Sequence, residues 1–381
     1  MTIQDLQRVA RRWWPRAVRD YVDGGADGEV SVSRNRQAYE SFDFVPIALR
    51  DVGAVDSGTD FLGRRTLLPF LLGPTGMTRM MHPDGEVAAA RAAQEAGIAY
   101  TVSTLSTVSL EDVAREHNTD LWFQLYVWRD RELSRQLLGR AHAAGYRVLV
   151  ITVDTAVSGL RVRDRHNGFS LPPHLTPRTL AEMTWHPGWC WGLLRGAPIS
   201  FANFDHTLTS TGQTVMDFVA RQFDPAVTWS DIEELRSLWH GPMLLKGMFG
   251  PVEACRAAEI GIDGLVLSNH GGRQLDQVVP PVVALPDVRA AVGETLQLFV
   301  DSGIRRGSDI VAALASGADG CLIGRSYLYG LGAAGQAGCS SAISILASEL
   351  RRTMQLLGVR TIAEIRECGP KIVRSKAGCR G

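Results

Sequence analysis

Short apolar runs alternate with stretches of helical spacing along most of the chain. Each run has the length and the β-branched or apolar content expected of a buried strand. The candidate strands are residues 68–74, 98–103, 121–126, 147–154, 243–247, 264–269, 296–301 and 320–324. Between most of them lie helical patterns such as 85–97 and 307–317, which end at glycine. This alternation predicts an α/β protein with one (β/α)8 TIM barrel, and an open doubly wound sheet is the alternative.

The strand spacing suggests one domain, residues 1–381, with additions to the barrel. We expect residues 1–65 to form a helical cover over a barrel that spans 66–365. The spacing is broken once, after the fourth strand, which predicts a long insertion at about 157–240. Residues 366–381 form the tail, which shows no pattern beyond about Cys368, so we expect that part to be disordered.

Polar residues stand where the predicted strands end, which is the face where barrel enzymes build their sites. These residues are Thr75, Gly76, Ser103, Gln124, Tyr126, Thr152, Asp154, Lys246, Ser268, Asn269, His270, Asp301, Gly324 and Arg325. Loops are polar in general, and that alone explains some of these positions. It does not explain why charged groups emerge directly from apolar strands, because burial of such groups costs several kcal/mol unless they are paired. We therefore predict a functional site at this face.

The last two strands are the usual phosphate-binding place in a barrel. Gly303 and Gly324 would allow close approach of an anion, and Arg305 and Arg325 would supply forked donors. We expect the helix that starts near Gly307 to add free N–H groups. A solvated arginine pair is the alternative.

The pattern GLGAAG at 330–335 matches a dinucleotide-binding motif but does not follow a strand directly, and no βαβ unit follows it. We interpret its glycines as positions of close helix packing.

A ligand with one phosphate and a polar ring edge would use these strand ends fully, and flavin mononucleotide (FMN) has both. Asp301 would lie near the ribityl hydroxyls. Ser103, Gln124 and Thr152 would bond the polar edge of the ring, and Lys246 would stabilise negative charge on the reduced flavin.

The bulk composition excludes other classes. Forty basic and forty acidic residues balance, so no net field would attract nucleic acid. The six cysteines (Cys190, Cys255, Cys321, Cys339, Cys368, Cys379) form no CxxC pair, which argues against a zinc site or a disulfide framework and favours a reducing cytoplasm. The N-terminus has no apolar signal core, and no long apolar run occurs. We expect a protein that is neither exported nor membrane-spanning, and that binds no metal.

Two long motifs, SNHGGRQLD (268–276) and DSGIRRGSDIVAALASGADGCLIGR (301–325), are specific enough to name a family. Together with DYVDGGA, GPTGM, LWFQLY, TVDTAVSGLRVRDRHNGF and LLKG in order, they resemble the FMN-dependent 2-hydroxy-acid dehydrogenases and oxidases. The likeness runs from about residue 5 to residue 365 and is greatest to mandelate dehydrogenases.

The resemblance implies a role for each matching residue. His270 would be the base, with Asp154 paired to it and Tyr126 and Arg273 completing the catalytic group. Gly271 and Gly272 would leave room for substrate and flavin. The substrate would contact Tyr21, Arg161, Arg273, Tyr126, Gly76 and Leu105. FMN would contact Pro74, Thr75, Gly76, Ser103, Gln124, Thr152, Lys246, Ser268, Asp301, Gly303, Arg305, Gly324 and Arg325.

The implied reaction oxidises an L-2-hydroxy acid to a 2-keto acid. Leu105 stands where glycolate-oxidising relatives have tryptophan, which favours a bulky or aryl substrate such as (S)-mandelate. Gly76 stands where oxidases usually have alanine, which favours a quinone as electron acceptor. The alternatives are a soluble oxidase that forms hydrogen peroxide, an FMN-requiring isomerase, and a flavin-binding protein without turnover.

The insertion contains a tryptophan-rich stretch, TWHPGWCWGLLRGAPISFANF (184–204). Trp185, Trp189 and Trp191 with apolar and basic neighbours are typical of a membrane interface. The stretch resembles the membrane-associating segment of mandelate dehydrogenases, so we expect a cytoplasmic protein that lies peripherally on the inner face of the cell membrane. The alternative is that the tryptophans pack onto the barrel or a neighbouring subunit. The family also implies a homotetramer.

Overall fold

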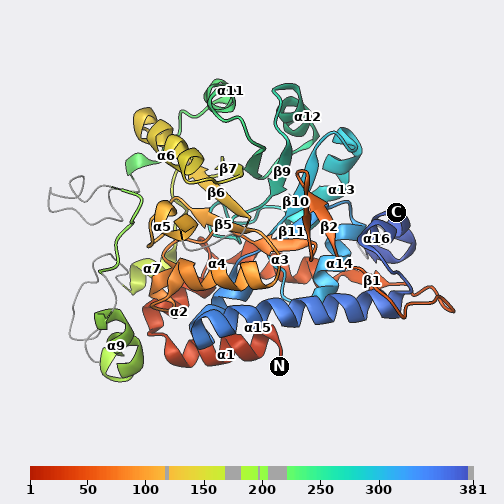
Figure 1. Cartoon of the computed structure of the whole chain (residues 1–381), viewed down its shortest axis with the longest axis horizontal. Helices are drawn as coiled ribbons and strands as arrows, with labels where there is room; N and C mark the ends of the chain where they lie inside the picture. The colour runs from red at the N-terminus through yellow and green to blue at the C-terminus, as the bar shows by residue number, and fades with distance from the viewer. Residues whose placement is uncertain (116–119, 168–181, 196–197, 205–220, 376–381) are drawn as a thin grey trace.

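The computed structural model describes residues 1–115, 120–167, 182–195, 198–204 and 221–375. At its centre eight parallel strands close into a barrel in the order β4 to β11 (Figure 1). The strands are β4 (Phe70–Leu72), β5 (Tyr100–Ser103), β6 (Leu121–Tyr126), β7 (Val148–Thr152), β8 (Met243–Gly247), β9 (Gly264–Leu267), β10 (Gln297–Val300) and β11 (Gly320–Ile323). Because β11 pairs with β4, the sheet has no edges and the open alternative is wrong. The predicted TIM barrel is confirmed, with each strand inside its predicted range.

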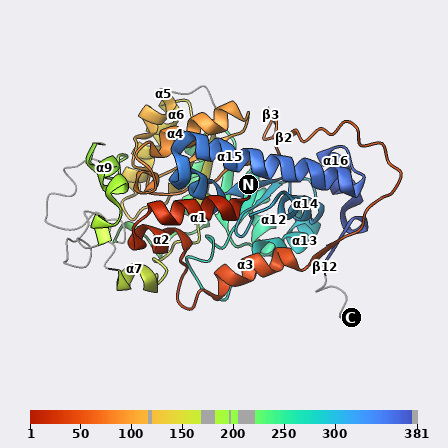
Figure 2. The ribbon, with the colours of Figure 1, turned by 90° about the horizontal axis from the view of Figure 1, so that it is seen from below.

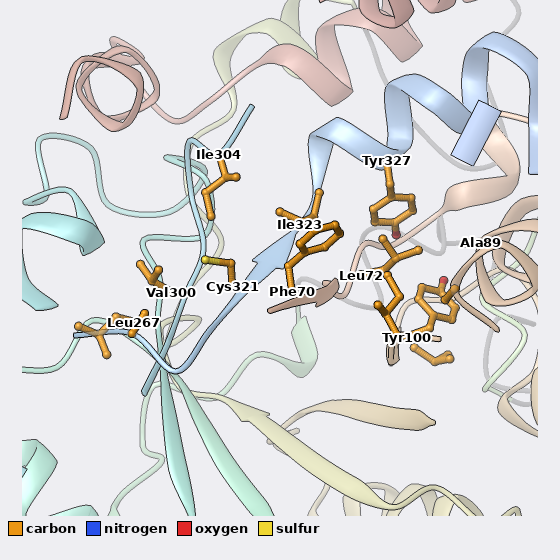
Figure 3. Packing of buried hydrophobic residues seen from close by; sticks show 14 of the residues in the cluster. Phe70, Leu72, Ala89, Tyr100, Leu267, Val300, Ile304, Cys321, Ile323 and Tyr327 are labelled. Atoms are coloured by element: carbon orange, nitrogen blue, oxygen red, sulfur yellow. The ribbon is translucent and has the colours of Figure 1, made fainter. Parts of the chain in front are cut away.

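Barrel strands are apolar on both faces because each face is covered. Leu71 of β4 and Leu322 of β11 belong to the inner core, whereas their neighbours Phe70 and Ile323 belong to the outer one. Figure 3 shows Phe70 and Ile323 beside Tyr327, which comes from a surrounding helix. Alternation of inner and outer side chains explains why the strands read as continuous apolar runs in the sequence.

A ring of helices encloses the barrel (Figures 1 and 2). It consists of α4 (Gly85–Glu95), α5 (Leu110–Arg115), α6 (Arg131–Ala143), α11 (Trp229–Leu238), α12 (Pro251–Glu259), α13 (Pro281–Val292), α14 (Gly307–Ala315) and α15 (Arg325–Leu357). The short 3-10 helix η1 (Thr78–Met80) precedes α4. Ser109 Oγ accepts a hydrogen bond from Asp112 N at 3.1 Å, which caps the start of α5.

The N-terminal cover contains α1 (Ile3–Trp13), α2 (Arg16–Asp23) and α3 (Val30–Glu40). Helix α1 lies along α15, and the motif GLGAAG falls inside α15. A Cβ on Gly332 would lie 2.0 Å from the ring of Trp14, so the motif serves helix packing, as interpreted from the sequence. The axis of α15 changes direction at Ala334 and Gly335, whose backbone angles are not helical.

The cover is not purely helical, and this corrects the prediction. A hairpin of β2 (Thr59–Phe61) and β3 (Arg64–Thr66) closes the N-terminal end of the barrel. Phe61 stacks edge-on against Phe299 at 5.0 Å and Trp122 at 6.5 Å between ring centroids, inside the inner core. Gln297 fixes the hairpin, since its Oε1 accepts from Leu62 N at 3.0 Å and its Nε2 donates to Asp60 O at 3.4 Å.

The connection from β7 to β8 contains α7 (Val162–His166), α9 (Pro187–Arg195) and α11. Figure 1 shows α11 between α6 and α12 in the helix ring. The predicted insertion range of 157–240 therefore includes a helix of the barrel itself. We propose that the insertion ends before Trp229, within one domain whose barrel spans 66–365.

The tail prediction is wrong for its first part. Helix α16 (Ile362–Cys368) and the 3-10 helix η3 (Gly369–Lys371) lead into β12 (Val373–Ser375). This strand pairs antiparallel with β1 (Phe42–Phe44), so the C-terminal segment is anchored to the N-terminal cover. Residues 376–381 lie outside the described part of the chain.

Candidate active site

A cavity opens at the carboxyl ends of the barrel strands and gathers most of the predicted site residues. Those that line it are Tyr21, Pro74, Thr75, Gly76, Ser103, Leu105, Gln124, Tyr126, Thr152, Arg161, Lys246, His270, Arg273, Asp301, Gly303, Arg305, Gly324 and Arg325. Four residues that were predicted at this site do not line the cavity: Asp154, Ser268, Asn269 and Gly272. The cavity also includes Val22, Ser302, Ile304, Leu322 and Leu328, which we did not predict. Ser302 could have been found from its place between Asp301 and Gly303, but Val22 and Leu328 come from helices.

His270 and Asp154 form a buried pair at this end of the barrel. The Nδ1 atom of His270 lies 3.0 Å from Asp154 Oδ1, and Ser268 Oγ accepts from the backbone N of His270 at 3.0 Å. His270 has a φ of +58°, a left-handed conformation that turns its ring back toward the cavity. Because Nδ1 is paired with the carboxylate, Nε2 is the ring nitrogen left to face a ligand.

Burial lowers the pKa of His270 below the 6.5 of a free imidazole, the Asp154 charge opposes this shift, and Lys246 and Arg161 reinforce it. Burial would raise the pKa of Asp154, but His270 and Lys246 hold it below its ordinary value. The pair therefore consists of a neutral imidazole and a carboxylate near neutral pH. Such an imidazole can accept a proton, and the carboxylate then stabilises the imidazolium.

The tyrosine nearest to the base comes from β6. The hydroxyl of Tyr126 lies 3.5 Å from His270 Nε2, and the two rings stack with 6.4 Å between centroids. Burial, and then the charge of Asp154, raise the pKa of Tyr126 above its ordinary value, so its hydroxyl stays protonated and can donate a hydrogen bond.

Two arginines face the same cavity. Arg273 lies over the ring of Tyr21 at 4.7 Å and donates from Nη1 to Gly24 O at 3.1 Å and to Tyr21 O. Burial, reinforced by the neighbouring charge of Arg161, lowers the pKa of Arg273 to about 10. The buried Nε of Arg161 has no hydrogen-bond partner within the described residues. Two adjacent guanidinium groups with an orphaned donor fit a carboxylate, which offers bidentate acceptance and cancels the repulsion.

The ends of β5, β6 and β7 carry a connected set of polar groups at the same cavity. Ser103 Oγ donates to Gln124 Oε1 at 3.0 Å, and Gln124 Nε2 donates to Thr152 Oγ1 at 2.8 Å. Lys246, with 4% of its surface exposed, lies 3.7 Å from Asp301 as measured between Nζ and Oδ2. A lysine so deeply buried fits a ligand that carries or develops negative charge.

The anion end differs from the prediction in one respect. The backbone N–H groups of Arg305 and Arg306 donate to Asp309 Oδ2, and that of Gly307 donates to Glu349 Oε2. These three N–H groups, at and just before the start of α14, are therefore already bonded. The first turn of α15 follows Gly324 at the cavity instead, so its helix terminus is the one that can meet an anion.

Arg325 contributes to the structure of this end as well as to its charge. It donates from Nε to Val22 O at 2.6 Å, from Nη1 to Gly271 O at 2.8 Å and from Nη2 to Gly24 O at 2.7 Å. Burial lowers its pKa from the ordinary value. Its guanidinium thus ties the N-terminal cover to the loop after β9.

The two glycines of that loop leave room for protein rather than for ligand alone. A Cβ on Gly271 would lie 2.6 Å from Arg325 Nη1, and one on Gly272 would lie 2.7 Å from the backbone N of Val32 in α3. Gly271 also lines the cavity, and its part in leaving room for substrate and flavin stays a prediction. Gly272 instead allows α3 to approach the loop.

Gly76 and Leu105 are in close contact at the cavity wall. A Cβ on Gly76 would lie 3.1 Å from Leu105 Cβ and 3.3 Å from Leu105 O. Met77 N donates to Leu105 O at 3.0 Å, which holds the two loops together. An alanine at position 76 would therefore push against the segment that carries Leu105.

The tryptophans in and just before α9 divide between the two interpretations. Trp189 is buried, with 6% exposed, and donates from Nε1 to Met80 O at 2.8 Å. Trp185, Trp191 and Leu194 are 82%, 56% and 78% exposed. One tryptophan therefore docks the helix on the barrel while the others face outward. In the described ranges, no helix has the length and apolar character needed to cross a bilayer.

A parallel barrel with a base, a carboxylate clamp, a buried lysine and an anion end belongs to the class of enzymes that act on an acid beside a phosphorylated cofactor. The model of the FMN-dependent dehydrogenase family matches residues 10–372, and the chain belongs to this family. It is an FMN-dependent oxidoreductase of the 2-hydroxy-acid dehydrogenase and oxidase group.

Curated relatives are similar over nearly their whole length. The chain is 46% identical over 379 residues to a "Putative L-lactate dehydrogenase" of Mycobacterium tuberculosis (strain ATCC 25618 / H37Rv), covering 97% of this chain and 91% of that protein. It is 43% identical over 371 residues to an L-lactate dehydrogenase of Caulobacter vibrioides (strain NA1000 / CB15N), with 95% of each covered.

Solved structures agree with the barrel. The crystal structure of the monotopic membrane protein (S)-mandelate dehydrogenase matches with a TM-score of 0.93 and 38% identity, covering 98% of this chain and 99% of that one. Mandelate oxidase with (S)-4-hydroxymandelic acid matches with a TM-score of 0.85 and 38% identity, covering 96% and 97%.

Proposed function

We propose that this protein oxidises an L-2-hydroxy acid with a bulky or aryl side chain, such as (S)-mandelate, to the 2-keto acid and passes the electrons to a quinone. The observation that carries the proposal is the arrangement of His270, Asp154 and two arginines around one cavity. A base and a carboxylate clamp at the same opening suit a substrate whose acidic group and reacting carbon are adjacent.

The residues of the cavity fit FMN. The ring would lie against the polar ends of β5 to β8, where Ser103, Gln124, Thr152 and Lys246 are positioned, with the loop Pro74–Gly76 beside it. The ribityl chain would follow Asp301, and the phosphate would meet Gly303, Arg305 and the start of α15 beyond Gly324. When bound, FMN would accept two electrons and one of the two protons that the substrate loses, and the other proton goes to His270.

His270 removes a proton from the substrate through Nε2, and Asp154 holds the ring from Nδ1 and balances the charge that results. Arg161 and Arg273 hold the substrate carboxylate, with Tyr21 beside them. Tyr126 donates a hydrogen bond to the oxygen that becomes the keto group. Ser268 supports the backbone of His270 rather than contacting FMN, which revises its expected role.

The substrate class is argued from Leu105. Its side chain leaves room where relatives that oxidise glycolate have tryptophan, and the similarity to mandelate dehydrogenase and oxidase supports an aryl substrate. The lactate dehydrogenases among the relatives favour lactate as the second candidate. Anaerobic reduction with lactate, mandelate, 4-hydroxymandelate and long-chain 2-hydroxy acids tests both. A faster bleaching of FMN by lactate than by mandelate would overturn the aryl assignment.

The acceptor is argued from Gly76, which the family uses in enzymes that reduce quinones. Reoxidation of the reduced protein in air-saturated buffer tests this point. Slow reoxidation by oxygen and fast reoxidation by a soluble quinone are expected. The opposite order would identify an oxidase that releases hydrogen peroxide. Absence of bleaching by any 2-hydroxy acid would favour an isomerase or a flavin-binding protein without turnover.

A membrane contact through α9 would bring the protein to its quinone. The exposed Trp185, Trp191 and Leu194 suit a lipid interface, and the neighbouring helices α1 and α2 add the exposed arginines Arg8 and Arg16. We place the protein on the cytoplasmic face of the membrane, as a homotetramer by family resemblance. Light scattering of the detergent-solubilised protein tests the oligomer.

A further inference from the structure

Gln274 follows Arg273 in the chain and is buried, with 8% of its surface exposed. Its side chain makes three hydrogen bonds to the loop after β7. Nε2 donates to Asp154 O at 3.0 Å and to Val157 O at 3.0 Å, and Oε1 accepts from Gly159 N at 3.1 Å. A single amide thus satisfies three backbone groups of another loop, which a side chain of any other type could not reproduce.

The two loops joined by this amide carry the two pairs of residues on which the site depends, His270 with Asp154 and Arg161 with Arg273. The loop after β7 contains Asp154 and reaches Arg161, while the loop after β9 carries His270 and Arg273. The three acceptor and donor positions on the first loop, residues 154, 157 and 159, span the turn between Asp154 and Arg161. Displacement of that turn would therefore move a member of each pair.

Backbone contact between the loops is close at Gly159. A Cβ there would lie 2.3 Å from Arg273 O and 2.8 Å from Gln274 Cα. Within the described ranges, Gln274 also provides every hydrogen bond between residues 155–167 and residues 268–278. Beyond the His270–Asp154 pair, Gln274 makes the direct side-chain hydrogen bonds between the two loops, while Ala26 N and Asp27 N of the cover bridge them indirectly through Gly272 O and Leu160 O.

We propose that Gln274 is a positioning residue that sets the loop after β7 against the loop after β9, and so holds Asp154 on His270 and Arg161 opposite Arg273. This inference rests on the proposed function for its catalytic consequence. Its structural part, the attachment of residues 155–161, is independent of turnover.

The test compares Gln274→Met with Gln297→Met in the FMN-loaded protein. Gln297 is a matched control because it also bonds two backbone groups, Leu62 N and Asp60 O, but at the opposite end of the barrel. Hydrogen exchange followed by mass spectrometry should show faster exchange of the peptide 155–161 in Gln274→Met. Gln297→Met should instead speed exchange of the β2–β3 hairpin.

Two functional measurements separate positioning from general destabilisation. The limiting rate of anaerobic FMN reduction by (S)-mandelate should fall by on the order of 10- to 100-fold in Gln274→Met, because small misplacements of reacting groups cost this much. The dissociation constant of phenylacetate, an unreactive carboxylate, should rise by about 10-fold because one arginine of the clamp moves. FMN content should match the wild type, and Gln297→Met should leave both values unchanged.

Gln274→Glu provides a second variant if the methionine variant does not accumulate. It keeps the size and the acceptor for Gly159 N but removes both donors, so the same losses are expected. Wild-type exchange at 155–161 in either variant, or losses equal to those of Gln297→Met, would overturn the proposal, as would failure of both Gln274 variants to fold with FMN. Failure of every 2-hydroxy acid to bleach the wild type would reject the proposed function instead, and the exchange result would still decide the role of Gln274.

Discussion

The two ends of the barrel use the same strands for opposite purposes. Strand β6 shows this most clearly, since its inward positions are Trp122, Gln124 and Tyr126, about 7 Å apart along the strand. Trp122 packs with Phe61 and Phe299 at the closed end, while Gln124 and Tyr126 line the cavity at the other. The inward side chains of β6 thus change from an aromatic ring of the closed end to polar groups of the cavity within two residues. The packed aromatic side chains of the closed end keep the strands rigid. The charged groups at the open end are therefore held in place.

The largest effect is expected from His270→Gln, which should change the chemistry at the open end and leave the closed end as it is. Loss of the base should slow anaerobic reduction of FMN by on the order of 10²- to 10⁴-fold. FMN should stay bound, because the phosphate and ring contacts lie on other strands. Stopped-flow absorbance measures both. If FMN in this variant is reduced at the wild-type rate, His270 is not the base. The contrast between a catalytic open end and a structural closed end would then fail.

Phe61→Ala should lower stability and leave the rate of FMN reduction nearly unchanged, the reverse of His270→Gln. Removing a fully buried aromatic ring from the closed end should lower the free energy of unfolding by about 3–5 kcal/mol. The reduction rate measured well below the unfolding transition should stay within a few-fold of the wild type. Denaturant titration and stopped-flow reduction on the same sample check this. If the reduction rate falls by more than the fraction of unfolded protein explains, the closed end also affects the chemistry at the open end.

Asp154→Asn tests how the charge of Asp154 controls the pKa of His270 at the open end. Removal of the carboxylate charge takes away the interaction that raises the pKa of His270, while burial, Lys246 and Arg161 continue to lower it. The acid limb of the reduction rate should therefore move to lower pH. The plateau should fall by about 10- to 100-fold, because the imidazolium loses its counter-charge. Reduction rates over the pH range in which the protein is folded test this, and a limb that moves to higher pH would contradict it.

Gly76→Ala probes the cavity wall. The added methyl would press on Leu105, and overpacking of this kind costs about 1–3 kcal/mol. We expect about 10-fold slower reduction by mandelate and faster reoxidation by oxygen. Substrate and acceptor preference should therefore change together. Gly139→Ala, on the open outer face of α6 where a Cβ meets nothing within 4 Å, is the control.

The smallest effect is expected outside the barrel. Replacing Trp185 and Trp191 by serine should weaken sedimentation with anionic vesicles while leaving reduction of FMN unchanged. Replacing Trp189 should instead reduce thermal stability, since its indole is buried against Met80 O. Equal vesicle binding by wild type and the double variant would remove the membrane proposal.

The sequence predicted the barrel well because each strand is a continuous apolar run with a glycine or polar residue at its end. The hairpin β2–β3 and the strand β12 were missed because each is three residues long and carries arginine or threonine, so periodicity gives no signal. Their existence depends on partners far along the chain, such as Gln297 for the hairpin.

The site was predicted as a set of residue types, and the structure shows which of them touch. The expectation of free N–H groups at the start of α14 was wrong in part, because Asp309 accepts from the two residues before the helix and Glu349 accepts from Gly307. Gln274 lies inside the motif that identified the family, yet nothing in the sequence indicates its partners. Its three bonds cross 115 to 120 residues of chain, and only the folded barrel brings them together.

The pairing of β11 with β4 also bears on how the polypeptide is made. Strand β4 emerges from the ribosome early, but the strand that completes its hydrogen bonding follows roughly 250 residues later, about 10–50 s at ordinary synthesis rates. Helix α1 waits longer still, because it ends at Trp13 and α15 begins only at Arg325. For that interval an apolar edge is open to wrong partners, so yield in a heterologous host should depend on chaperone supply more than on the final stability of the protein.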